Sequence, residues 1–261
     1  MFDFHLHSTV SFDGKSAPAE MALAARDRGL REICFTDHID RDIYLAPDAM
    51  TFRTEDYNAA YDSLTVPGLT IRRGIEFGMK PGNRQDFDKA LQRRPFDFVL
   101  GSVHFVKELN AYKEPFWQGK TVEQAERDYL EEMLTCVQVH DQFDVLAHLN
   151  FLSKSKFNPG HIPMHYEPHR EILDAILELL VQKGKGLEIN TSGICRNVGF
   201  LPGKEFFVRF RELGGQIVTM GSDAHQSSRV GEHIPEAAEI LRDVFGYVCT
   251  YENRQPVFHK L

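Results

Sequence analysis

The sequence contains few cysteines, and none of them forms a recognisable pair. Cys34, Cys136, Cys195 and Cys249 are widely separated along the 261 residues, and no two of them make a CxxC motif. Thiols scattered in this way are typical of proteins that are kept reduced, in which cysteine acts as a small buried hydrophobic side chain. The cysteine pattern therefore predicts a cytoplasmic setting.

Long hydrophobic runs are also absent. No apolar segment approaches the ~20 residues that a membrane-spanning helix needs. A secretory signal is not expected either, because Asp3 and His5 interrupt the apolar character of the amino terminus. We therefore expect a protein that has no membrane partner.

Basic residues do not predominate. The chain has 30 Lys and Arg against 38 Asp and Glu, which gives a formal net charge of -8 at pH 7. This balance argues against an extended grip on a phosphate backbone, so we expect no nucleic-acid partner. It still permits a local cationic pocket, because bound divalent metals would reverse the sign of the charge where they sit.

Strand-like and helix-like segments alternate seven times without a composition break. The strands are expected at 1–7, 31–36, 69–77, 96–104, 143–147, 186–190 and 216–225, and the helices at 18–28, 54–64, 85–94, 121–140, 168–183, 204–213 and 235–245. Seven βα units predict a closed or nearly closed parallel barrel, a distorted TIM-like (β/α)7 fold, with residues 1–261 as a single domain. An open doubly wound sheet is the alternative, and no structure is predicted for 246–261.

The first strand ends in His5-Leu6-His7, and side chains on a strand alternate between its two faces. His5 and His7 therefore point the same way, and Asp3 on the same face could orient one of the rings. Later strands also end in such groups, at His38, Glu76, His104, His148 and Asp223. In parallel α/β folds the active site lies at the carboxyl ends of the strands, so these side chains should meet there.

Imidazole and carboxylate together are the ligand set of zinc, manganese and iron sites. Six histidines, one glutamate and two aspartates share the position expected for this site; they are His5, His7, His38, His104, His148, His225, Glu76, Asp13 and Asp223. Nine such groups are too many for one ion. They predict two or three divalent metal ions.

The same residues form a set of motifs that resembles a known family. The motifs are HxH at His5–His7, TDH at Thr36–His38, GIE at Gly74–Glu76, GSVH at Gly101–His104, AH at Ala147–His148 and GSDAH at Gly221–His225. In this order they resemble the PHP (polymerase and histidinol phosphatase) superfamily of distorted seven-stranded barrels that hold three metals. FDFVLGSVH, EINTSGICR and Arg254-Gln255-Pro256-Val257 resemble its stand-alone histidinol-phosphate phosphatases.

The resemblance implies three metal positions. His5, His7, Glu76 and Asp223 would hold the first, Glu76, His104 and His148 the second, and Asp13, His38 and His225 the third. Metals about 3.5–4 Å apart lower the pKa of a bridging water and clamp phosphoryl oxygens. The expected activity is therefore hydrolysis of L-histidinol phosphate, a step of histidine biosynthesis, by attack of a metal-bridging hydroxide, with Glu76, Asp223 and His225 as the catalytic groups.

Three further residues are candidates for contact with a small phosphomonoester substrate. Arg196 follows the sixth strand and offers a guanidinium for bidentate phosphate binding, and Lys154 follows His148 closely. Trp117 lies on a long loop that could cover the imidazole of the substrate. His161, His165 and His169 share a spacing of four, but Pro163 and Pro168 interrupt the stretch, so we expect loop histidines and not metal ligands.

Two other functions remain open from the sequence. One is a PHP phosphoesterase that acts on nucleotides or short oligonucleotides, which the acidic balance disfavours. The other is an inactive metal-binding module that docks a partner, which the complete ligand set disfavours. A homo-oligomer is compatible with the sequence, which does not specify the oligomeric state.

Overall fold

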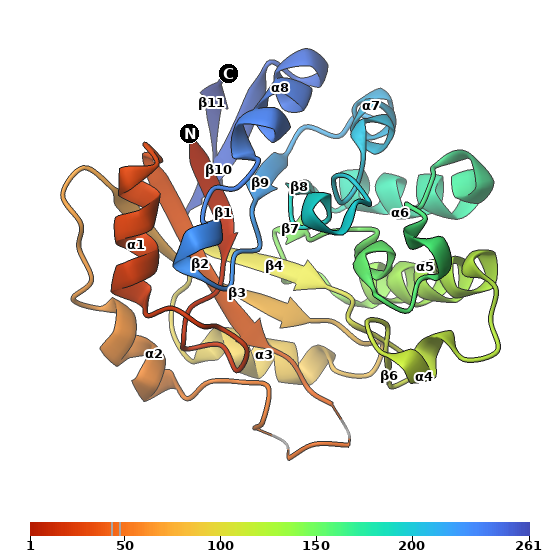
Figure 1. Cartoon of the computed structure of the whole chain (residues 1–261), viewed down its shortest axis with the longest axis horizontal. Coiled ribbons are helices and arrows are strands. Elements are labelled where there is room, and N and C mark those ends of the chain that lie inside the picture. Colours follow the sequence, from red (N-terminus) through yellow and green to blue (C-terminus); the bar gives the residue numbers. More distant parts are fainter. Residues whose placement is uncertain (43, 47) are drawn as a thin grey trace.

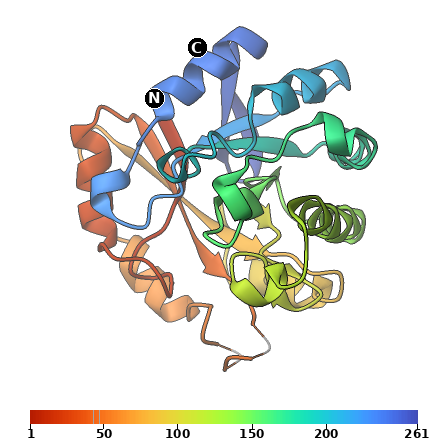
Figure 2. The same cartoon turned by 45° about the vertical axis from the view of Figure 1, so that its right-hand side comes forward.

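The computed structural model describes residues 1–42, 44–46 and 48–261. Seven parallel strands form one sheet in the order β1-β2-β3-β4-β7-β8-β9. Their bounds are Phe2–Leu6 (β1), Glu32–Ile39 (β2), Thr70–Gly78 (β3), Phe98–Ser102 (β4), Val145–Leu146 (β7), Gly186–Asn190 (β8) and Val218–Gly221 (β9). The helices lie around the outside of this sheet (Figures 1 and 2). The predicted order of strands and helices is confirmed.

The two edge strands of the sheet, β1 and β9, meet at their carboxyl ends. The Asp223 N–H donates to the His5 carbonyl at 2.8 Å, and the His7 N–H donates to the Ala224 carbonyl at 2.9 Å. These bonds draw the segment after β9 against β1 and make the barrel nearly closed. The predicted TIM-like (β/α)7 barrel is confirmed, and the open doubly wound alternative is not observed.

The helices that cover the barrel are α1 (Pro18–Asp27), α2 (Thr54–Tyr61), α3 (Arg84–Gln92), α5 (Val122–Val139), α6 (Arg170–Gln182), α7 (Lys204–Glu212) and α8 (Ile234–Val244). The longest, α5, begins with a capping box in which the Thr121 hydroxyl accepts from the Gln124 N–H. Its buried side chains recur at helical spacing, at Ala125, Tyr129, Met133 and Val137. This one apolar stripe fixes the face that packs on the barrel.

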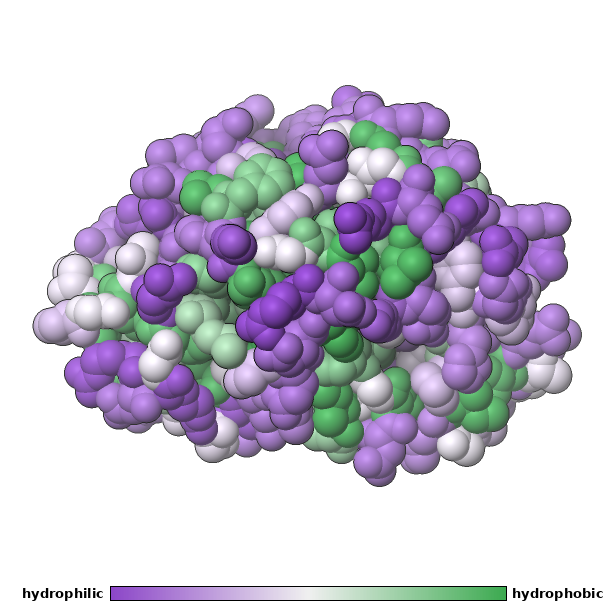
Figure 3. Space-filling model, turned by 90° about the horizontal axis from the view of Figure 1, so that it is seen from above, coloured by the Kyte–Doolittle hydropathy of each residue, from purple (hydrophilic) through white to green (hydrophobic). Residues whose placement is uncertain are grey.

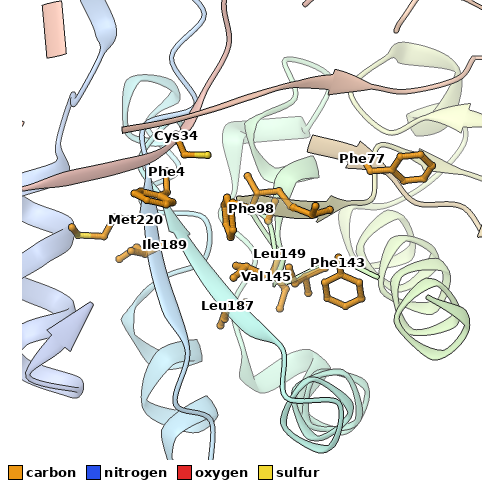
Figure 4. Close-up of a cluster of buried hydrophobic side chains, with 14 of the residues drawn as sticks. Phe4, Cys34, Phe77, Phe98, Phe143, Val145, Leu149, Leu187, Ile189 and Met220 are labelled. Carbon is orange, nitrogen blue, oxygen red and sulfur yellow. The ribbon is translucent and has the colours of Figure 1, made fainter. Parts of the chain in front are cut away.

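Aromatic side chains fill the amino-terminal end of the barrel. The rings of Phe4 and Phe98 meet edge to face with centroids 5.6 Å apart (Figure 4). A hairpin of β10 (Tyr247–Glu252) and β11 (Gln255–Lys260) packs against this end, and the centroid of its Tyr251 ring is 4.8 Å from that of Phe98. The stretch for which no structure was predicted therefore closes this end. The opposite end of the barrel, where the strands have their carboxyl ends, carries the polar residues.

The loops after the strands carry several short elements. They are β5 (Phe105–Val106), β6 (Leu109–Asn110), α4 (Glu114–Trp117) and five 3-10 turns, η1 (Phe151–Lys154), η2 (Pro159–His161), η3 (Glu167–His169), η4 (Ile194–Arg196) and η5 (Ser227–Arg229). On the face seen in Figure 3, hydrophobic residues occur in separate patches among hydrophilic ones. Within the described ranges, no helix has the length and apolar character needed to cross a membrane.

Candidate metal centre

Glu76 lies at the middle of the carboxyl end of the barrel, and five histidines surround its carboxylate. Oε2 is 2.8 Å from His38 Nδ1, 3.4 Å from His5 Nε2 and 3.5 Å from His7 Nε2. Oε1 is 2.8 Å from His148 Nε2 and 3.4 Å from His104 Nε2. The carboxylate is fully buried. The structure therefore brings together the predicted groups of five different strands.

The remaining three predicted groups complete the cluster on the side of β1 and β9. Asp223 Oδ1 is 3.5 Å from His7 Nε2 and 3.8 Å from His5 Nε2. Asp13 Oδ2, from the loop after β1, is 3.2 Å from His225 Nε2 and 3.7 Å from His38 Nε2. All nine predicted residues thus lie in one continuous cluster.

Several buried polar atoms of this cluster make no hydrogen bond of acceptable geometry, although His38 Nδ1 and Glu76 Oε2 lie close together. The atoms without such a bond are His5 Nε2, His7 Nε2, His38 Nδ1, His148 Nδ1, Glu76 Oε2 and Asp13 Oδ1. An unpartnered buried polar atom costs free energy, so such a concentration of them calls for a ligand. Nitrogen and oxygen donors of this kind fit zinc, manganese or iron. The residues present therefore fit a group of divalent metal ions.

Among the described residues, four groups have possible ligand atoms that all lie within 4.8 Å of one another; they are His5-His7-Asp223, His5-Glu76-His148, His7-His38-His225 and His38-Asp40-His104. The first belongs to the ligand set expected for the first metal. The second shares Glu76 and His148 with the set expected for the second metal. The last contains Asp40, which the sequence did not indicate.

Two carboxylates that were not predicted from the sequence contact histidine rings on the side away from the centre. Glu188 Oε1 lies 2.6 Å from His5 Nδ1, and its Oε2 accepts from the His148 N–H at 2.8 Å. Asp40 Oδ2 lies 2.6 Å from His104 Nδ1. A hydrogen bond at Nδ1 fixes the tautomer of an imidazole and turns its Nε2 lone pair toward the centre. Glu188 and Asp40 are therefore ring-orienting residues.

Asp3 does not orient a ring, which corrects the expectation from the sequence. Its carboxylate accepts from the N–H and the hydroxyl of Ser222 and from the Gly231 N–H. Burial raises the pKa of Asp3 to about 6, although these hydrogen bonds favour the ionised form. Asp3 instead holds the turn that carries Asp223, whose φ of 54° is strained for a residue other than glycine.

The cluster keeps its carboxylates ionised. Burial alone would raise the pKa of Glu76, but His38, His5 and His104 outweigh it and hold that pKa well below its usual range. Burial disfavours the charged form of His104, yet Asp40 and Glu76 outweigh this effect and raise the pKa of that imidazole to about 9. Negative charge collected in a buried site favours the binding of cations.

The expected substrate contacts lie in different surroundings. The Lys154 ammonium donates to Asp223 Oδ2 at 2.6 Å and to the Ser192 hydroxyl at 3.0 Å, so it lies at the edge of the centre. Arg196 is exposed in η4, after β8. Trp117 does not fit the expected role, because its ring is only 6% exposed and its indole N–H donates to the Ala111 carbonyl. It packs its own loop instead.

The evenly spaced histidines lie outside the cluster, as expected. His169 is buried and lies 2.8 Å from the Glu126 carboxylate on α5. His165 lines a surface groove between α6 and α7. None of the four compact groups within the described ranges contains His161, His165 or His169.

We expect Glu188→Gln to weaken metal binding about 10–100-fold, the usual effect of losing a partner behind a ligand. The neutral amide leaves His5 without the carboxylate that fixes its tautomer. Metal affinity is measured by competition with a chromophoric chelator. Glu178→Gln, on the exposed face of α6, is the control and should bind metal like the parent protein. Equal affinities of the two variants would contradict the orienting role of Glu188.

Comparison with known proteins gives a consistent result. Residues 3–192 match the family model described as PHP domain. Histidinol-phosphatase of Lactococcus lactis is 29% identical over 245 residues, which cover 92% of this chain and 90% of that protein. A protein of Thermotoga maritima named probable histidinol-phosphatase is 28% identical, over 93% of this chain and 91% of its own length.

Two solved structures share the fold. The crystal structure of histidinol phosphate phosphatase from Lactococcus lactis, complexed with zinc, L-histidinol and phosphate, superposes with a TM-score of 0.86 and 28% identity, over 98% of each chain. A crystal structure from Listeria monocytogenes, named putative histidinol phosphatase, has a TM-score of 0.73 at 19% identity, over 90% of this chain and 99% of that one. The second supports the barrel alone.

Proposed function

The chain belongs to the PHP domain family, and we propose that it is a metal-dependent phosphatase that hydrolyses L-histidinol phosphate to L-histidinol and phosphate. One observation carries the proposal. A buried cluster of unpartnered imidazole and carboxylate atoms lies at the active end of a barrel that is similar, over its whole length, to a histidinol phosphate phosphatase. The cofactors are divalent metal ions, and zinc is the ion bound in that similar structure.

We propose the ligands as three sets. His5, His7, Glu76 and Asp223 would hold the first ion, Glu76, His104 and His148 the second, and Asp13, His38 and His225 the third. Bound divalent ions supply an activated water at neutral pH and neutralise the charge on phosphoryl oxygens. Glu76 links the first two sets, which is consistent with the imidazoles that face each of its oxygens.

Residues of the chain bind the charged phosphate and transfer protons in this reaction. Lys154 approaches Asp223 and can bind a phosphate oxygen from the same position, with Arg196 as the second cation. Lys154 and Ser192 occupy Asp223 Oδ2, which leaves Oδ1 facing the imidazoles. Burial opposes ionisation of Asp223, but Lys154 and His5 outweigh it and hold its pKa well below the usual range. Asp223 is therefore ionised at neutral pH and offers Oδ1 to a metal ion, while His225, whose Nδ1 lies 3.5 Å from that oxygen, is placed to transfer a proton.

A covalent serine intermediate has no support in the cluster. Ser102 donates its hydroxyl to Glu76, and Ser222 donates its hydroxyl to Asp3. A nucleophilic serine needs a base that accepts its proton and is oriented by a third group. Glu76 is already surrounded by the imidazoles of the centre, and Asp3 holds a turn. Both serines therefore support the carboxylates.

The experiment measures phosphate release by protein stripped of metal and then loaded with zinc or manganese. The panel contains L-histidinol phosphate, mononucleotides and an aryl phosphate. We expect activity only with metal, and a kcat/KM for histidinol phosphate that is orders of magnitude above the others. A preference for mononucleotides would overturn the substrate and keep the reaction class. Filled metal sites without turnover would favour a binding module.

The remaining expectations concern partners and location. The net charge of -8 supports a small-molecule substrate without a nucleic-acid partner. The four cysteines are free, which is consistent with a reducing compartment such as the cytoplasm. Self-association stays a prediction, to be measured by light scattering.

A further inference from the structure

Phe12 is a large aromatic side chain that stays exposed beside the metal centre. Its ring is 49% exposed, and its centroid lies 5.3 Å from that of His38. The next residue, Asp13, is one of the nine groups of the cluster. An exposed phenyl ring gains nothing from burial in the core. Its position against a proposed metal ligand therefore suggests a part in binding.

The turn that carries Phe12 is held rigidly. The Ser11 N–H donates to the Ser8 carbonyl at 3.0 Å, and the Ser11 hydroxyl donates to Asp37 Oδ1 at 3.0 Å. The Lys15 N–H donates to the His225 carbonyl at 2.7 Å. A Cβ atom at Gly14 would lie 1.7 Å from the Ser8 oxygen, so the turn closes tightly. Ser11 and Asp13 point inward, and Phe12 between them is fixed at the rim.

Phe151 also lies against the centre, and it is half-buried among several ring partners. Its centroid lies 4.8 Å from that of His104, 5.0 Å from that of His148 and 5.9 Å from that of Tyr112. The Lys154 ammonium lies 4.9 Å from the same ring. Phe151 therefore has a packing role. For Phe12, His38 is the single ring partner found among the described residues.

We propose that Phe12 is a specificity-determining residue whose open face receives the aromatic ring of the substrate's leaving group. This rests on the proposed function, in which that ring is the imidazole of histidinol. Offset stacking of two rings, or contact of a protonated imidazole with the phenyl face, favours a ring over an aliphatic group of the same charge. Phe12 would therefore select the alcohol, while the metals and cations bind the phosphate.

The experiment compares Phe12→Ala and Phe12→Tyr with the parent protein, all loaded with zinc and checked for equal metal content. Inhibition by L-histidinol and by inorganic phosphate is measured separately. We expect Phe12→Ala to raise the inhibition constant of histidinol about tenfold and to leave that of phosphate unchanged. Phe12→Tyr keeps the aromatic face and should restore binding. Phe258→Ala is the matched control, because Phe258 is 51% exposed on the hairpin at the other end of the barrel.

Equal weakening of histidinol and phosphate binding would overturn the inference, because Phe12 would then act through the cluster. An unchanged histidinol constant would overturn it too. If the parent protein hydrolyses phosphomonoesters but not histidinol phosphate, the proposed function fails by itself. Phe12→Ala is then compared on an aryl phosphate and on phosphoethanolamine, which has no ring. A selective loss on the aryl phosphate would still support the role of Phe12, and equal losses would refute it.

Discussion

Replacing Glu76 with glutamine is expected to lower kcat/KM for histidinol phosphate by about a thousandfold or more. Five imidazole nitrogens lie 2.8–3.5 Å from its two oxygens, so this one carboxylate connects groups from every side of the centre. The amide has the same shape without the negative charge, and it offers hydrogens where lone pairs are needed. Loss of metal assistance costs several kcal/mol, and about 4 kcal/mol corresponds to a factor of about a thousand.

The matched control is Ser102→Ala, which removes the hydroxyl that donates to Glu76 Oε1. It leaves both oxygens and the charge in place, so we expect a loss of at most about tenfold, the scale of an ordinary supporting hydrogen bond. Steady-state kinetics at saturating zinc, with metal content measured on the same samples, separates the two variants. If Glu76→Gln retained more than a tenth of the parental kcat/KM, Glu76 would not be central to the site.

The positions of the nine groups could be predicted because two simple regularities act together. Alternation along β1 places His5 and His7 on one face, and parallel strands bring their carboxyl ends to one edge. The sequence alone therefore indicates that the metal-binding residues lie at the carboxyl ends of the barrel strands. The closure of β1 against the segment after β9 then sets His7 and Asp223 side by side.

The ring-orienting carboxylates could not be predicted in the same way. Glu188 contacts a histidine 183 residues away, and only closure of the barrel brings the two together. A signal did exist in the sequence, because Glu188 is a charged residue in the middle of the strand expected at 186–190, and the structure buries every residue of that strand. A buried glutamate is rare unless it is paired. Gly221 makes the approach possible, since a Cβ there would lie 2.2 Å from Glu188 Oε1.

The closing hairpin was missed because its turn lacks the usual sequence signal. Asn253 and Arg254 connect β10 to β11 with φ values of 49° and 64°, a two-residue turn that normally uses Asn-Gly. An arginine in the left-handed region is uncommon and costs free energy. Hydrogen bonds from Arg254 to the Asp97 carbonyl and to the Asp144 carboxylate offset that cost. Tertiary contacts therefore determine this turn.

Removing the metals is expected to lower the melting temperature by about 10 °C without unfolding the chain at 25 °C. Ions at a concentration a thousandfold above their dissociation constant stabilise the folded state by about 4 kcal/mol. For a protein of this size each kcal/mol shifts Tm by roughly 2–4 °C. Small zinc domains unfold without metal, but this barrel has a large hydrophobic core of its own. The fold should therefore persist.

Thermal unfolding followed by circular dichroism, with chelator and then with zinc restored, measures this shift. Glu76→Gln is the informative variant, because it lacks the central carboxylate charge and should show a much smaller difference between the two states. His233→Ala, at the start of α8 and outside the cluster, should show the full parental difference. If chelator left the Tm of the parent protein unchanged, the buried polar atoms around Glu76 that lack a hydrogen bond would need a partner other than metal. A shift equal in Glu76→Gln and in the parent would place the stabilising ions elsewhere in the chain.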